Sequence, residues 1–384
     1  MAIWGGMTVE NQYSVLAMEP YAAPSHMAFL RGLQAYSQHR WELLTLPPRK
    51  WKWRMRTSAL HFAAALAERP RPDLLFVTDY LNLAEMKALL PAELRSIPTV
   101  LYFHENQLTY PLHELERRDF HFGLTHLYAI LTADRVYFNS HYHRTRFMDA
   151  LTEVLKLVPD VQTDAALATA QSRSGVLPLG VAAELSATDG IEPLSRPAWI
   201  LWNHRWEYDK RPELFLAGLR ELVERGYDFR VRILGQRFRE EHPVLQELRE
   251  LLGPRLHDAG FPKDRARYFA MLKECDIVVS TAIHEYFGHG VLEAIRAGAY
   301  PVLPNDLAYP ELIPLSLRGA GSPFLYPVEL GVGRALADAL EVVARGGRRE
   351  ERLRLRAETE RFSWPRLIHE YDRILAELVT AHPA

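Results

Sequence analysis

The chain has 384 residues, 48% of them hydrophobic and 24% charged, with a formal net charge of −2 at pH 7. Such a composition is globular, and the near-neutral charge excludes a general attraction to nucleic acid or membrane, so any such contact needs a local patch. The length is too great for one ordinary core and predicts two α/β domains, which implies a cleft.

A single cysteine, Cys275, excludes an internal disulfide framework and a cysteine cluster for zinc, and we expect it to be buried beside a strand at 276–280. The N-terminus shows no basic region followed by an apolar run and a small-residue cleavage site. No run of about 18 apolar residues occurs in the sequence. We therefore expect a cytoplasmic protein that makes no membrane contact.

The first half of the chain alternates apolar runs with helical stretches. Continuous apolar runs are typical of strands buried in a parallel sheet. They predict strands at 15–18, 41–46, 73–78, 99–103, 135–138 and 175–179, helices at 25–36, 81–90, 120–131 and up to 155, and a surface loop at 159–174.

The loop at 19–26 is a candidate wall of the cleft, because doubly wound sheets bind ligands outside the carboxyl ends of their strands. It contains Glu19, Ser25 and His26 but no glycine, so a glycine-rich phosphate loop is absent. The alternative is an ordinary turn in which Ser25 caps the following helix.

Residues 49–56 form the most basic patch of the sequence, with five cations, two tryptophans and no acid. Cations bind phosphates and indoles stack on bases, so nucleic acid would bind at this patch if it binds at all. The alternative is a solvated basic loop with Trp51 and Trp53 in the core.

A polar run follows the predicted strand at 99–103 and consists of His104, Glu105, Asn106 and Gln107. Such a run at the end of a central strand is unfavourable to bury without a ligand. This favours a functional site over the alternative of an ordinary structural histidine.

A change of composition at 186–197 predicts a hinge between the two domains. The alternation then restarts, with strands at 199–202, 229–234 and 276–280 and helices up to 225 and at 263–274, 290–297, 333–345 and 364–378. Gly235 permits a close backbone approach, and the predicted loop at 257–262, which includes Phe261 and Pro262, could hold a base through its backbone.

Two charged motifs follow strands of the second half. Arg205 and Lys210 flank a turn, where two cations would neutralise a diphosphate; surface salt bridges are the alternative. The segment 280–293 predicts a strand, a turn and the start of a helix, which is a seat for phosphate. Glu285 and Glu293 lie on one side of it and could accept sugar hydroxyls, although a solvated helix face is the alternative.

The two glutamates resemble the E-x7-E motif of retaining glycosyltransferases of the GT-B type. Four runs together resemble the tRNA-queuosine mannosyltransferase family: KWKWRMRTSAL at 50–60, LYFHENQLTYP at 101–111, NHRWEYDK at 203–210 and HEYFG at 284–288. The resemblance covers about residues 13–378, and the HENQ-x-x-YP block is specific to this family.

The resemblance implies a GT-B fold of two Rossmann-like doubly wound domains, at 13–185 and 197–363, that face each other across a cleft, with 364–384 packing back on the first domain. It implies mannose transfer from GDP-mannose, with retained configuration and no metal or other cofactor. The acceptor would be the cyclopentene ring of queuosine at the wobble position of tRNA(Asp).

The resemblance also implies roles for single residues. Glu285 would meet the mannose hydroxyls and Glu293 the ribose, while Arg205 and Lys210 would bind the diphosphate and His104 would face the mannose. Other expected donor-binding residues are Gly235, Phe261, Pro262, Phe287, Gly288, His289 and Gly290. Expected acceptor-binding residues are Glu19, Ser25, His26, Lys50, Lys52, Trp53, Arg54, Arg56, Glu105, Asn106 and Gln107.

The sequence departs from the family pattern in one place. Its first loop has Ala23 and Pro24 where the family pattern E-x-x-Y-G-G-S-H has two glycines. Without the two glycines, a close approach of the loop backbone to donor or acceptor is in question. The identity of the acceptor is in question for the same reason. A GT-B enzyme with a lipid or glycan acceptor and a non-catalytic tRNA-binding protein are the two alternative functions.

Overall fold

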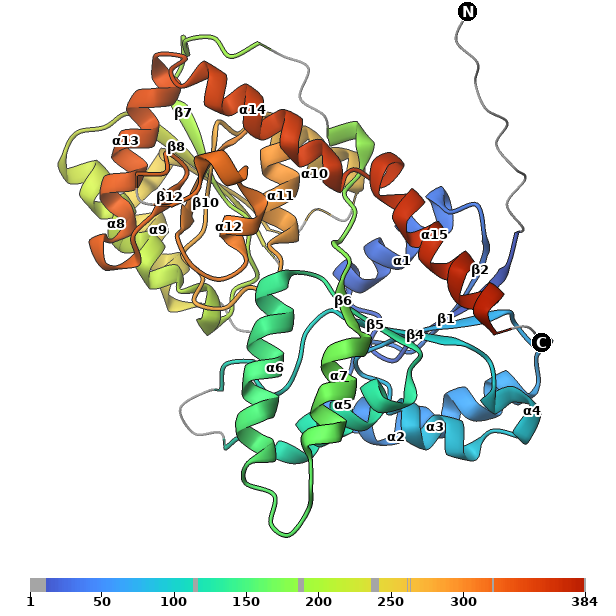
Figure 1. The fold of residues 1–384 in the computed structure, drawn as a ribbon. Helices are drawn as coiled ribbons and strands as arrows, with labels where there is room; N and C mark the ends of the chain where they lie inside the picture. The colour runs from blue at the N-terminus through green and yellow to red at the C-terminus, as the bar shows by residue number, and fades with distance from the viewer. Residues whose placement is uncertain are drawn as a thin grey trace, which may run out of the picture. The chain divides into compact units, whose positions relative to one another are not determined.

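The computed structural model describes residues 12–112, 117–185, 190–235, 242–260, 262, 264–319 and 321–382. The chain forms two compact units: unit 1 comprises Met1–Gly180 and Trp364–Ala384, and unit 2 comprises Val181–Ser363. Each unit holds a six-stranded sheet whose neighbouring strands are parallel, with helices on both faces (Figure 1).

The sheet of unit 1 has the strand order β2-β1-β3-β4-β5-β6. Its strands are β1 (Ser14–Glu19), β2 (Arg40–Thr45), β3 (Leu74–Thr78), β4 (Thr99–Phe103), β5 (Arg135–Phe138) and β6 (Ser174–Val176). One face is covered by α1 (Pro24–Tyr36) and α15 (Trp364–Ala381). The other is covered by α2 (Trp51–Ala67), α3 (Leu83–Leu89), α4 (Ala92–Arg95), α5 (Phe120–Thr132), α6 (His141–Leu155) and α7 (Asp164–Arg173).

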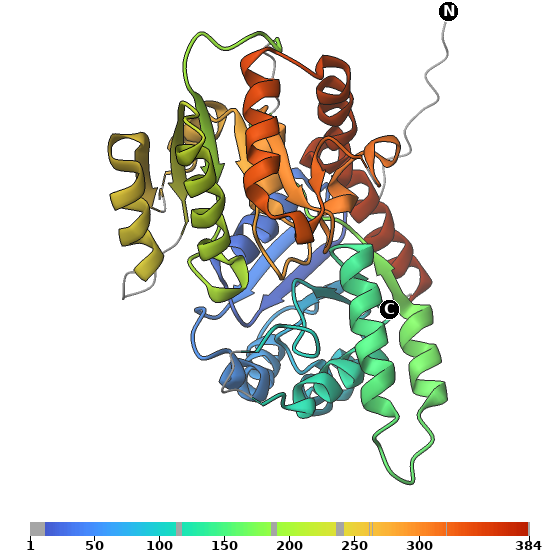
Figure 2. The ribbon, with the colours of Figure 1, turned by 90° about the vertical axis from the view of Figure 1, so that its left-hand side faces the viewer.

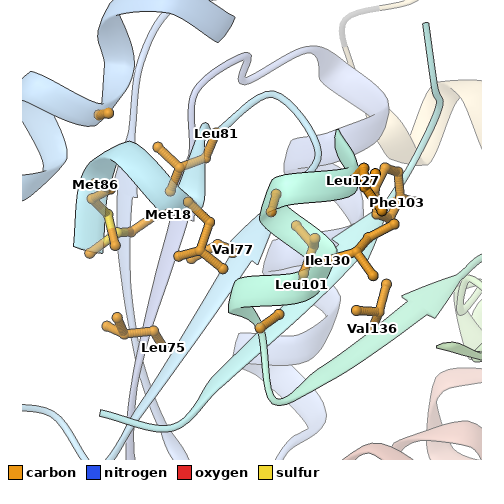
Figure 3. Close-up of a cluster of buried hydrophobic side chains, with 14 of the residues drawn as sticks. Met18, Leu75, Val77, Leu81, Met86, Leu101, Phe103, Leu127, Ile130 and Val136 are labelled. Carbon is orange, nitrogen blue, oxygen red and sulfur yellow. The ribbon is translucent and has the colours of Figure 1, made fainter. Parts of the chain in front are cut away.

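The core of unit 1 lies on both faces of its sheet because the central strands are apolar on both sides. Every residue of β3 and β4 is buried. Figure 3 shows part of the larger cluster, in which Met18, Val77 and Leu101 of the strands lie among Met86 and Ile130 of the helices. Burial of this apolar surface is the main term that stabilises the unit.

Helix α15 completes unit 1, although unit 2 precedes it in the sequence. Its first residue, Trp364, packs against Gly32 and Gly180. A Cβ added to Gly32 would lie 2.2 Å from the Trp364 indole, and one added to Gly180 would lie 2.3 Å from it. Further along the helix, the Tyr371 hydroxyl donates to the Pro178 carbonyl at 2.8 Å. The indole therefore fills space that any larger residue at either glycine would occupy.

The sheet of unit 2 has the strand order β12-β11-β10-β7-β8-β9. Its strands are β7 (Ala198–Trp202), β8 (Phe229–Leu234), β9 (Leu256–Gly260), β10 (Ile277–Val279), β11 (Tyr300–Pro304) and β12 (Leu325–Tyr326). Helices α8 (Pro212–Glu224), α9 (Pro243–Leu252) and α13 (Val332–Ala344) lie side by side (Figure 2). A second group consists of α10 (Arg265–Lys273), α11 (His289–Arg296) and α14 (Arg349–Thr359), and α12 (Tyr309–Leu312) follows β11.

The strand orders fix where polar loops gather. The order reverses between β1 and β3 in unit 1 and between β7 and β10 in unit 2, and such switch points are where open α/β sheets bind ligands. In unit 2 the register pairs Trp202 with Val279, so the loops at 203–211 and 280–288 leave the sheet at the same level. This pairing builds the candidate site.

Two predicted loops are wrong. Helix α7 occupies most of the predicted loop at 159–174, and β9 occupies most of the predicted loop at 257–262. The alanine-rich α7 lacks apolar periodicity, and β9 is an edge strand with polar residues. Pattern reading therefore failed where the apolar signal is weakest.

The structure settles two smaller predictions. Ser25 does not cap α1, because that helix begins at Pro24 and its cap residue Ala23 makes no side-chain bond. Cys275 is buried, as predicted, with 4% exposure. Residues 186–189 of the predicted hinge lie outside the described residues. Within the described part of the chain, no helix is both long and apolar enough to cross a membrane.

Candidate functional site

The candidate site of unit 2 lies at its switch point and centres on Lys210. The Lys210 side chain is buried, and its ammonium donates to the His284 carbonyl at 2.6 Å and to Glu285 Oε2 at 3.4 Å. It also forms an ion pair with Asp209 Oδ2 at 3.0 Å, so three oxygen atoms lie around this one cation. The Thr281 hydroxyl also donates to the Lys210 carbonyl at 2.8 Å, which joins the two loops.

The charges around Lys210 hold one another in their ionised forms. Burial alone lowers the pKa of Lys210, but Glu285 and Asp209 outweigh it and raise that pKa above its usual value. Burial opposes ionisation of Glu285, yet Lys210, followed by His204 and His284, lowers its pKa to about 2. Glu285 is therefore a carboxylate at neutral pH, and Lys210 is an ammonium.

His204 and Arg205 flank this group on the loop that follows β7. Burial, reinforced by Lys210, lowers the pKa of His204 to about 4, so its ring is neutral. The Arg205 side chain is half-exposed, forms an ion pair with Glu207 at 3.0 Å and lies near enough to act on the pKa of Lys210. The structure thus brings Arg205, Lys210 and Glu285 to one edge of the sheet.

Glu293 lies on α11 and is held in place by two side chains. Its Oε1 accepts from Arg265 at 3.2 Å and its Oε2 from the Tyr268 hydroxyl at 2.8 Å. The same hydroxyl accepts from Asn203 Nδ2 at 2.8 Å. Glu293 is 4% exposed, so a ligand hydroxyl would have to share these oxygens.

The glycines of the site serve close packing. Gly288 has φ +87° and caps α11, a conformation that side-chain-bearing residues rarely adopt. An added Cβ at Gly235 would lie 1.8 Å from the His204 carbonyl oxygen, and one at Gly290 would lie 3.0 Å from Asn203 Nδ2.

The other expected donor residues are less informative. Phe287 is buried and its ring lies 5.8 Å from that of Phe362, edge to face. His289 Nδ1 lies 3.8 Å from Glu293, and Pro262 is partly buried. Phe261 lies outside the described residues.

A second polar cluster lies at the switch point of unit 1. Glu19 is fully buried and its Oε2 lies 3.0 Å from His26 Nδ1. Burial lowers the pKa of His26, but the charge and hydrogen bond of Glu19 outweigh it and raise this pKa to about 9. The rings of His26 and His104 are stacked, with centroids 4.1 Å apart, and the His104 amide donates to Asp79 at 3.1 Å.

Glu19, His26 and His104 have ligand atoms close enough for a metal ion. The planes of the two imidazoles are only 19° apart, however, so an ion in the plane of one ring lies far out of the plane of the other. Metal binding would require one ring to rotate, and it would compete with the hydrogen bond between Glu19 and His26. The arrangement suits hydrogen bonding to a ligand better.

The polar run after β4 divides into two kinds of residue. Glu105 accepts from the Tyr80 hydroxyl and, at 3.3 Å, from Gln107. Asn106 has no exposed surface, and its Oδ1 accepts from the amides of Leu108 and Thr109 at 3.0 and 2.9 Å. This side chain therefore shapes its own loop, and its role in acceptor binding stays a prediction.

The first loop does not need the missing glycines. Ala23 has φ −65°, and Pro24 is the first residue of α1, where its fixed φ and absent N–H are well tolerated. Ser25 is exposed on the first turn, whereas His26 points into the buried cluster with Glu19.

The basic patch belongs to the start of α2, so the alternative of a basic loop with two core tryptophans is wrong. Trp53 is 66% exposed, and Trp51 is partly buried with its ring 5.0 Å from that of Phe122. Arg54 donates twice to the Pro47 carbonyl, and Arg56 stacks over Phe122. Lys50 and Lys52 are exposed beside them.

Comparison with known proteins decides the family. A sequence model described as tRNA-queuosine alpha-mannosyltransferase N-terminal matches residues 14–181, and one described as glycosyl transferases group 1 matches residues 191–319. The tRNA-queuosine alpha-mannosyltransferase of Drosophila melanogaster is 36% identical over 309 residues, which cover 78% of this chain and 81% of the fly protein. The chain belongs to the tRNA-queuosine alpha-mannosyltransferase family.

Members of the tRNA-queuosine alpha-mannosyltransferase family are glycosyltransferases, and so is this chain. Sucrose-phosphate synthase from Thermosynechococcus elongatus matches its structure with a TM-score of 0.69 at 14% identity, over 96% of this chain and 100% of the other. A glycosyltransferase from Rickettsia africae matches with a TM-score of 0.66 at 12% identity, over 96% and 99%. These likenesses and the two parallel sheets confirm the predicted GT-B fold.

Sequence reasoning about this family member missed several side chains of the two clusters. Asp209 and His284 lie directly before predicted residues and hold Lys210 from both sides. Asp79 and Tyr80 follow the buried strand β3, so the rule that drew attention to His104 applies equally to them. Tyr268 on α10 gave no signal, because its contact with Glu293 depends on the tertiary fold.

Proposed function

We propose that this chain transfers mannose from GDP-mannose to queuosine at the wobble position of tRNA(Asp), with retention of the anomeric configuration. The proposal rests on one observation above all: in a member of this family, Lys210, Glu285 and Arg205 lie together at the ligand-binding edge of a Rossmann-like sheet. The two cations of this group would bind a diphosphate, and its carboxylate would accept hydrogen bonds from sugar hydroxyls.

The donor diphosphate would lie between Arg205 and the start of α11. The first amides of a helix have no acceptor within it, and the helix dipole favours an anion there. α11 begins at His289, directly after the Glu285 loop. Arg205, half-exposed, and the amides of residues 287–290 would stabilise the charge that develops on the leaving phosphate.

Glu293 would bind the ribose of the nucleotide. A carboxylate oxygen can accept more than one hydrogen bond, so a ribose hydroxyl can join Tyr268 and Arg265 at this group. The half-exposed Arg265 side chain would move away from Glu293 when the ribose binds. This explains why a buried carboxylate at this position remains useful for binding.

The acceptor would bind to unit 1. Glu19, Asp79 and Glu105 supply acceptors for ring hydroxyls, and the charged His26 supplies a donor. Cations at the start of a helix oppose its dipole, and α2 has no acidic residue in its first turn to relieve them. Phosphates of tRNA would offset this unfavourable interaction between the cations and the helix dipole. This favours Lys50, Lys52 and Arg56 as RNA contacts.

The chemistry proposed is front-side displacement. The acceptor oxygen bonds to the anomeric carbon on the face from which the phosphate oxygen departs, and that phosphate oxygen takes the hydroxyl proton. Such a route retains configuration and needs no protein nucleophile. Charge develops mainly on the diphosphate, and so the cations of unit 2 carry the largest catalytic effect.

The direct test is incubation with labelled GDP-mannose and queuosine-containing tRNA, followed by mass analysis of the nucleosides. A gain of one hexose on queuosine is expected. Arg205→Ala should lower the rate by about 10²–10³-fold with unchanged circular dichroism. Product with UDP-sugars alone would contradict the donor, and a hexose on another acceptor would contradict queuosine. Near-normal turnover of Arg205→Ala would contradict the role of Arg205 at the diphosphate.

We also propose that the transfer needs no metal ion, because protein cations already supply positive charge at the diphosphate. Excess EDTA should therefore leave the initial rate unchanged. The control is readdition of Mg²⁺ and Mn²⁺, which should not raise it. Loss of activity on chelation, restored by one of these ions, would contradict this part of the proposal.

A further inference from the structure

The three partners of the Lys210 ammonium are not held equally. The His284 carbonyl and Asp209 lie at 2.6 and 3.0 Å, and the Asp209 side chain is only 1% exposed. Glu285 lies at 3.4 Å, its side chain is 22% exposed, and its other oxygen accepts from the Phe287 amide at 3.3 Å. Both contacts of Glu285 are long for hydrogen bonds, so it is the partner that can leave.

The proposed function gives each of these groups a second partner. A diphosphate would seek the Lys210 ammonium, and a sugar hydroxyl would seek the Glu285 carboxylate. Lys210 already faces two carboxylates, and a diphosphate would add further negative charge beside them. These anions repel one another, so a diphosphate that approaches the single ammonium favours the departure of the carboxylate that is held least tightly.

We propose that Glu285 and the diphosphate of the nucleotide compete for the Lys210 ammonium, so that diphosphate binding releases Glu285 to the sugar. This inference rests on the proposed function of the site. After transfer the sugar is gone, and Glu285 returns to Lys210 and helps to displace the remaining nucleoside diphosphate. Glu285 therefore acts against product binding as well as toward the donor sugar.

The test is the affinity of nucleoside diphosphates, measured by titration calorimetry with GDP and, separately, UDP. Glu285→Gln keeps the size of the side chain and removes its charge, so we expect it to bind GDP roughly three- to tenfold more tightly than the wild type. Glu293→Gln is the matched control, because Glu293 contacts Tyr268 and Arg265 instead of Lys210, and it should bind no more tightly. Equal or weaker GDP binding by Glu285→Gln overturns the inference.

The same titrations separate the inference from the proposed function. If UDP binds and GDP does not, the donor assignment fails, while tighter UDP binding by Glu285→Gln still supports the competition. If neither diphosphate binds the wild type, both fail. GDP-mannose should gain no affinity in Glu285→Gln, because the sugar exchanges a carboxylate acceptor for the weaker amide oxygen. An equal gain for GDP and GDP-mannose would contradict the release of Glu285 to the sugar.

Dependence on Lys210 completes the test. In a Lys210→Met background, checked for folding by circular dichroism, Glu285→Gln should no longer tighten GDP binding. The same gain in both backgrounds would show that Glu285 repels the diphosphate without the help of Lys210, and it would overturn the competition for the ammonium. Should Lys210→Met fail to fold, the contrast between GDP and GDP-mannose in Glu285→Gln decides the question alone.

Discussion

Glu19 keeps a positive charge on His26 inside unit 1, and this makes stability depend on pH. The folded pKa of about 9 exceeds the usual histidine pKa of 6.5, so between these two pH values the folded protein holds a proton that the unfolded chain releases. The stabilisation is complete below pH 6.5 and is lost as pH rises toward 9, by up to about 1.4 kcal/mol per pH unit.

Chemical denaturation at several pH values between 6.5 and 9 measures this loss. His26→Gln is the control, because it should be less stable at the acidic end and should lack the decline. An identical decline in the variant would assign the effect to another group.

Gly235 leaves room for one carbonyl oxygen only. In Gly235→Ala the new Cβ would start 1.8 Å from the His204 oxygen, a backbone atom that moves only if the loop at 203–211 moves. We expect the free energy of unfolding to fall by about 1–3 kcal/mol. Transfer activity should fall further than the fraction of folded protein does. Gly190→Ala is the control, since its nearest neighbour is the flexible Glu192 side chain, and comparable losses in both variants would contradict the explanation.

Site residues that belong to a recognisable sequence motif could be found from the sequence. Site residues that are defined by contacts with distant parts of the chain were missed. Glu285, Glu293 and Lys210 could be predicted because each belongs to a short motif. Asp209 could not, since an Asp beside a Lys resembles a surface pair until burial shows otherwise. Asn106 belongs to a motif as well, yet its side chain supports the loop that carries the motif.

At the scale of elements, the proposed RNA contact belongs to the first turns of α2. Replacing Lys50, Lys52 and Arg56 with Ala should raise the KM for tRNA by about tenfold or more and flatten its dependence on salt, with the KM for the donor unchanged. Arg54 is left intact because it holds the Pro47 carbonyl. Kinetics at several salt concentrations measure both effects.

The control for α2 is charge removal elsewhere on unit 1. Lys156→Ala with Arg373→Ala removes two exposed cations outside the patch and should leave the tRNA kinetics unchanged. An equal rise in KM would mean that only net charge matters.

Several strands with continuous apolar runs could be located from the sequence almost residue by residue. β4, β5 and β8 have the predicted bounds because their apolar runs end at polar residues. α7 and β9 could not be predicted in this way: one consists of small residues without an apolar stripe, and the other pairs along one edge only. Their structure follows from neighbours that local patterns do not reveal.

At the scale of the whole molecule, Trp364 ties the C-terminal helix to unit 1. Its side chain is 4% exposed and fills the space beside Gly32 and Gly180, so Trp364→Ala should cost about 3–5 kcal/mol of stability. Trp53→Ala makes the same chemical change at a 66% exposed site and should stay within about 0.5 kcal/mol of the wild type. Unfolding by denaturant measures both, and similar losses would contradict the role of Trp364.

The return of α15 to unit 1 has a consequence for how a cell makes this protein. Translation delivers Met1–Gly180 first, then all of Val181–Ser363, and only afterwards the helix that covers one face of the first sheet. The middle of the polypeptide can therefore mature before this helix has been synthesised. The first sheet is made earliest, yet one of its faces is covered last.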